Sequence, residues 1–112
     1  MGTTVLLVGL KAGVVDQAKR GVGMPDLEVL AATGVDEVRA LFARTRIDHV
    51  IMGAGLELED RVAVIREVFR ASDSTTVHMK DRASGPGGFL PFIRAVLHGL
   101  HPEPASSIEH AT

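Results

Sequence analysis

The stretch Thr4-Val5-Leu6-Leu7-Val8-Gly9 decides the fold, because it is nearly all apolar and ends at a glycine. A strand with this pattern has both of its faces covered, which is typical of a parallel sheet with helices on either side. Residues 48–53 repeat the pattern, and residues 27–32 and 75–80 have the length of further strands. Helical periods separate the four segments, so the sequence predicts an α/β fold.

Polar residues in two of the strands indicate the strand order. Glu28 interrupts the second strand, and the fourth places Thr76, His78 and Lys80 on one face. Half-polar strands belong at sheet edges, whereas the continuous apolar first and third strands belong at the centre. With right-handed crossovers, we expect a four-stranded parallel sheet in the order 2-1-3-4 with helices on both faces.

The helical segments carry their own signals. Thr33 is predicted to cap the second helix, with Asp36 three residues later, as in a capping box. The third and longest helix has an apolar stripe with spacings of four, three and four, which is typical of an amphipathic helix. The stripe consists of Leu58, Val62, Ile65 and Phe69.

The composition of the chain limits the classes of protein to which it can belong. The chain has 112 residues, of which 46% are hydrophobic, and its formal net charge is −2. These values predict one domain over residues 1–100, followed by a tail over 101–112. A slightly acidic chain with neither Trp nor Tyr argues against nucleic-acid binding. Cysteine is absent, and the first apolar run is too short for a signal peptide or a membrane span, so we expect a cytoplasmic protein that does not contact membranes.

The candidate binding site lies where the carboxyl ends of the strands meet. The proposed order places a switch point between strands 1 and 3, where open α/β sheets bind ligands. A glycine-rich loop after strand 4 could hold a phosphate or carboxylate through backbone amides and two cations, or it could be a flexible turn into the last helix. The candidate ligand-binding residues are Lys11, Lys80, Asp81, Arg82, Ser84, Gly87 and Gly88.

Other chemistry has weaker support. The chain has no Gly-x-x-x-x-Gly-Lys-Ser/Thr loop, no Gly-x-Gly-x-x-Gly after strand 1 and no Gly-x-Ser-x-Gly elbow. His98 and His101 have metal-ligand spacing, but no third ligand is fixed, so no metal is predicted. His78 could act as a general base, although an exposed or interface histidine is the commoner case. No cofactor is indicated, and no catalytic residue is assigned.

The order of elements resembles the flavodoxin-like class, and residues 47–52 are similar to the third strand of response-regulator receiver domains. The resemblance implies the same doubly wound architecture over most of residues 3–100. The residues on which the phosphorylation of receiver domains depends are replaced by others in this sequence. Leu10 and Lys11 stand where receivers carry an acidic pair, and Gly53 replaces the phospho-accepting Asp. The Asp-x-His-x-x-Gly signature of cobalamin-binding domains is also absent.

We therefore expect a non-catalytic binding or protein-interaction domain that senses a small anionic ligand. The alternatives are a small enzyme or enzyme subunit acting on an anionic metabolite, and a scaffold without a small ligand. We also expect a homo-oligomer, formed through the edge of strand 4 or through the last helix, whose apolar arc is wider than one sheet face needs. That arc consists of Phe89, Phe92, Ile93, Val96, Leu97 and Leu100.

Overall fold

A computed structural model describes residues 2–81 and 88–100 of the chain. Strands and helices alternate along it without exception. In chain order the elements are β1 (Thr3–Val8), α1 (Ala12–Gly21), β2 (Leu27–Ala32), α2 (Val35–Arg44), β3 (His49–Met52), α3 (Leu58–Ala71), β4 (Thr76–Met79) and α4 (Phe89–Leu100).

The four strands form one all-parallel sheet in the order β2-β1-β3-β4, which confirms the predicted topology. Val8 pairs with Ala32 on one side and with Met52 on the other, and Met52 pairs with Met79. The ladder runs one residue past the strands, since the amide of Gly53 donates to the Val8 carbonyl at 2.9 Å. The apolar strands are therefore central, and the strands with polar residues are at the edges.

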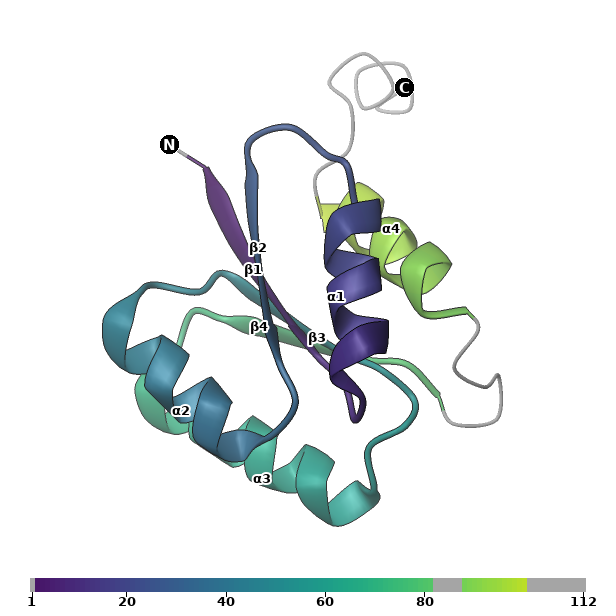
Figure 1. Cartoon of the computed structure of the whole chain (residues 1–112). Helices are drawn as coiled ribbons and strands as arrows, with labels where there is room; N and C mark the ends of the chain where they lie inside the picture. Colours follow the sequence, from purple (N-terminus) through teal and green to yellow (C-terminus); the bar gives the residue numbers. More distant parts are fainter. Residues whose placement is uncertain (1, 82–87, 101–112) are drawn as a thin grey trace, which may run out of the picture.

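Two helices cover each face of the sheet, as Figure 1 shows, with α1 and α4 on one side and α2 and α3 on the other. Alternate residues of β1 supply the two cores, because successive side chains of a strand point to opposite faces. Val5 and Leu7 pack with residues of α1 and α4, whereas Leu6 and Val8 pack with residues of α2 and α3.

The apolar stripe of α3 is not the face that this helix buries. Leu58, Val62 and Phe69 are 70%, 36% and 59% exposed. The helix instead buries Val64 and Val68 against the sheet, together with Arg61 and Glu67. The buried stripe is displaced by one residue, which corresponds to a rotation of about 100° around the helix axis. A row of apolar side chains therefore faces solvent. It lies on the flank of α3 away from α2, because Glu67 on the other flank accepts a hydrogen bond from Arg39 of α2 at 3.2 Å.

The predicted cap of α2 is wrong by one residue. Gly34, rather than Thr33, is the N-cap, and no side chain caps the helix there. The acid in the box is Glu37, whose carboxylate accepts hydrogen bonds from the backbone N–H and the hydroxyl of Thr33 at 2.6 and 2.7 Å. The hydrogen bonds thus run opposite to those of a side-chain N-cap, because the carboxylate of Glu37 inside the helix accepts from Thr33, the residue before the N-cap.

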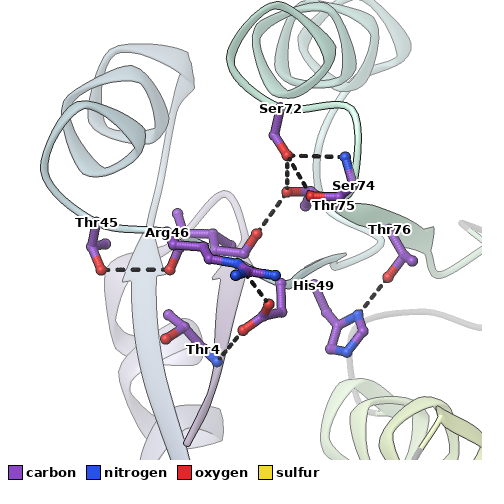
Figure 2. Close-up of polar contacts among 10 residues, drawn as sticks. Thr4, Thr45, Arg46, His49, Ser72, Ser74, Thr75 and Thr76 are labelled. Carbon is purple, nitrogen blue, oxygen red and sulfur yellow. Dashed lines mark hydrogen bonds and ion pairs between the residues drawn. The ribbon is translucent and has the colours of Figure 1, made fainter. Parts of the chain in front are cut away.

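Polar contacts tie together the loops at the amino ends of β3 and β4 (Figure 2). The Asp48 carboxylate accepts a hydrogen bond from the Thr4 amide at 2.9 Å. The Thr75 hydroxyl donates to the Ile47 carbonyl at 2.6 Å. These bonds cross from one strand or loop to another, so they fix how the strands enter the sheet. No helix among the described residues is long and apolar enough to cross a membrane.

Candidate functional site

A cavity of about 190 Å³ opens at the carboxyl edge of the sheet, between the loop after β1 and the loop after β3. This is the switch point that the strand order predicts, because the crossovers from β1 and from β3 leave in opposite directions. Most of the lining surface is apolar. The lining residues are Gly9, Leu10, Lys11, Val14, Gly53, Ala54, Gly55 and Phe89.

Glycines shape the cavity by letting the chain pass close to buried side chains. A Cβ on Gly9 would lie 2.6 Å from Cγ2 of Val15, which is itself fully buried in the core. A Cβ on Gly53 would meet the Phe89 ring at 3.5 Å, an ordinary contact distance. Glycine at position 9 therefore allows α1 to pack closely on the sheet, and glycine at position 53 leaves open the space beside Phe89.

Arg61 holds the loop that forms one wall of the cavity. Its guanidinium is buried and donates to the carbonyl of Leu56 at 3.1 Å and to that of Gly53 at 3.2 Å. Two carbonyl dipoles compensate a cation that burial would otherwise penalise. The loop from Gly53 to Leu56 is thereby fixed to the first turn of α3. Arg61 was not among the residues predicted from the sequence.

The start of α1 gives the cavity a positive rim. Lys11 is the N-cap of this helix, its side chain is exposed, and it lines the cavity. The first turn of α1 has no acidic residue, and no side chain caps it. The first amides of a helix have no partner within the helix, and they carry partial positive charge. The cavity therefore combines an apolar interior with a rim that favours an anionic group.

The other predicted ligand-binding residues lie apart from this cavity or outside the described residues. The Lys80 side chain is buried and packs against Gly88 at the start of α4; a Cβ on Gly88 would lie 3.2 Å from Cε of Lys80. Asp81 is exposed. Of the candidates in the described ranges, Lys11 is the one that lines the cavity. Arg82, Ser84 and Gly87 lie outside the described residues.

Two histidines form a cluster at the opposite end of the sheet. Nδ1 of His49 lies 2.6 Å from the Thr76 hydroxyl oxygen, as Figure 2 shows, and Nε2 of His78 lies 2.9 Å from the same oxygen. A hydroxyl has one proton, so it can donate to at most one of the two rings, and the tautomers of the histidines decide which nitrogen donates. Partial burial lowers the pKa of His78 below its ordinary value. Sequence reasoning treated His78 singly and missed this pairing across two strands.

His98 is exposed near the end of α4, and His101 lies outside the described residues. Within residues 2–81 and 88–100, no three side chains of His, Asp or Glu gather in a way that could hold a metal ion.

Comparisons of the chain with protein-family models, with curated proteins and with solved structures found no match. The resemblance to receiver domains therefore stays a prediction from the sequence.

Proposed function

We propose that this chain is a non-catalytic binding domain of flavodoxin-like architecture, which holds a small ligand with an apolar body and one anionic group. The cavity at the switch point supports this most directly, because it is largely apolar inside and has Lys11 and the start of α1 at its rim. An apolar body would contact Leu10, Val14 and Phe89. The anionic group would face the rim.

The size of the cavity limits the ligand. Pockets for drug-sized ligands measure about 300–1,000 Å³, so a cavity of about 190 Å³ suits a smaller ligand. Short carboxylic acids and small phosphate monoesters fit it, and both carry the charge that the rim favours.

The geometry favours binding over the alternative of a small enzyme acting on an anionic metabolite. Catalysis at the carboxyl edge would need Lys11, Lys80 and Asp81 to converge on one ligand. Lys80 is instead buried against Gly88, and Asp81 is exposed outside the cavity lining. An apolar cavity with Lys11 as the one cation among its described lining residues suits recognition.

A thermal-shift screen tests the proposal, because a ligand that binds only the folded state raises apparent stability. The panel consists of short carboxylic acids and small phosphate monoesters with apolar chains of increasing length. At about 100 times its Kd, a true ligand adds ~2.7 kcal/mol. That raises Tm by roughly 10–20 °C for a domain of this size. A flat response across the panel at millimolar ligand would contradict the proposal.

A further inference from the structure

The exposed stripe of α3 and the edge strand β4 form one continuous candidate interface, here called the α3–β4 surface. It consists of the exposed Leu58, Val62 and Phe69 and the half-buried Ile65 on α3, with Met79 on β4. Met79 is 44% exposed, and it points to the α3 side of the sheet because it is two residues from Val77, which packs against that core. Exposed apolar patches of this kind mark interaction surfaces.

Within residues 2–81 and 88–100, the edge has none of the protecting features that free edges usually have. Among the described residues, β4 pairs with β3 alone. Its residues, Thr76–Met79, include no Asp, Glu, Lys or Arg, and the side chain of the following Lys80 is buried. Charged side chains are the common means by which edge strands avoid further pairing. This edge is therefore suited to pairing with another strand.

We propose that the occupant is a second copy of the same chain, related by a two-fold axis perpendicular to the sheet. Such an axis reverses the direction of β4, so the two edge strands pair antiparallel and the two sheets become one sheet of eight strands. The same axis keeps each face of the sheet on its own side. The α3 helices of the two copies therefore lie next to each other on one face.

The spacing of the helices supports this arrangement. Val64 and Val68 of α3 share one core with Val50 of β3, and Val77 of β4 packs against the same core. A helix seated between two strands in this way has its axis about half a strand spacing inside the edge. With strands about 4.8 Å apart, the two α3 axes come to lie about 10 Å apart. Helices in direct contact pack at about 8–10 Å. Continuing the sheet thus brings the two exposed stripes into contact.

The stripe is also complementary to itself. Its spacings of four, three and four read the same in both directions, so antiparallel helices place Leu58 opposite Phe69 of the second copy and Val62 opposite Ile65. Charges agree with this register. The exposed Glu59 in the first turn of one helix would lie near the exposed Arg66 and Arg70 of the other.

The buried area is sufficient for a dimer. The four exposed apolar side chains of this surface present on the order of 400 Å² in each copy. Two copies contribute about 800 Å², and the strand backbones and polar rim bring the total near the ~1,000 Å² that specific interfaces need. The last helix, α4, offers less exposed apolar area than this surface. Its Phe89, Ile93 and Leu97 are buried, and Phe92 and Val96 pack against them.

Sedimentation of the full chain at concentrations up to about 100 µM tests the proposal, because a dimer with a micromolar Kd is then populated. The expected result is a species of twice 11.9 kDa. Val62→Glu should raise the Kd of the dimer by at least ~30-fold. Ala95→Glu is the control, because Ala95 is also an exposed apolar residue of a helix but lies on α4, which covers the other face of the sheet.

A charge swap tests the register. Leu58→Lys and Phe69→Glu should each weaken the dimer by at least ~30-fold. The double variant places each lysine opposite a glutamate of the second copy. Its Kd should therefore be at least ~10-fold lower than that of either single variant. A single species of 11.9 kDa at every concentration overturns the proposal. So does a dimer that tolerates Val62→Glu, or a double variant no tighter than either single one.

Discussion

Replacing Arg61 with methionine should destabilise the domain strongly, although the residue is a polar one on a surface helix. The buried guanidinium donates to the carbonyls of Leu56 and Gly53. Methionine keeps an unbranched apolar stem, but it is shorter and has no guanidinium. The change therefore removes two hydrogen bonds and leaves the two carbonyl oxygens without these donors.

The magnitude follows from those two bonds. A hydrogen bond to a charged group contributes about 1.5–3 kcal/mol, so two contribute roughly 3–6 kcal/mol at most. Loss of the desolvated charge offsets part of this cost. We expect a net loss of about 2–4 kcal/mol, which lowers Tm by roughly 8–30 °C in a domain of this size. Arg61→Lys should cost less, because an ammonium can reach one carbonyl but lacks the fork of the guanidinium.

Urea unfolding followed by circular dichroism measures the effect. The midpoint should fall while the slope stays unchanged, since the variant keeps the same fold. Arg44→Met is the control, because Arg44 is exposed in the last turn of α2, and its loss should cost no more than ~1 kcal/mol. If Arg61→Met costs no more than the control, the two carbonyl contacts do not stabilise the loop.

Three further predictions concern pH and packing. The backbone and hydroxyl hydrogen bonds from Thr33 lower the pKa of Glu37. The stabilising contribution of Glu37 is therefore present above the unfolded value of 4.5 and is lost as pH falls through the lowered pKa. Glu37→Gln should flatten that part of the curve of unfolding free energy against pH. Burial lowers the pKa of His78, so stability should decline as pH falls below 6.5, and NMR titration should place its pKa under that of an unfolded control. Gly9→Ala should cost about 1–3 kcal/mol in urea unfolding, because its Cβ would overlap Val15, and Val15→Ala in the same chain should recover part of the loss.

Much of the fold could be predicted from the sequence, because the strands differ in composition. The apolar runs of β1 and β3 can be covered on both faces only at the centre of the sheet, and this sets the order of all four strands. The orientation of α3 could not be predicted in this way. The helix carries two stripes, one through Leu58 and Val62 and one through Val64 and Val68, and periodicity alone does not choose between them. Arg61 favours the second, because its partners are carbonyls of a loop that sequence patterns do not place.

The position of the candidate site was predicted in outline, and its residues were predicted in part. Strand order locates the switch point, and Lys11 lies there. The preference for Lys80 came from its charge, and the structure shows that its side chain is buried against Gly88. Phe89 was assigned to the core of the last helix, yet it also lines the cavity. Its position depends on how α4 packs back on the sheet, which local sequence does not encode.

Calorimetric titration of the tightest ligand from the thermal-shift panel into Lys11→Ala and Lys19→Ala variants tests the central claim most directly. Both lysines are exposed on or beside α1, but Lys11 lines the cavity at the start of the helix and Lys19 lies in its last turn. The proposal predicts that Lys11→Ala weakens binding about tenfold, which corresponds to the loss of one charge-assisted contact of ~1.4 kcal/mol, while Lys19→Ala binds like the unmodified chain. Equal affinities in the two variants would contradict a ligand site at the switch point.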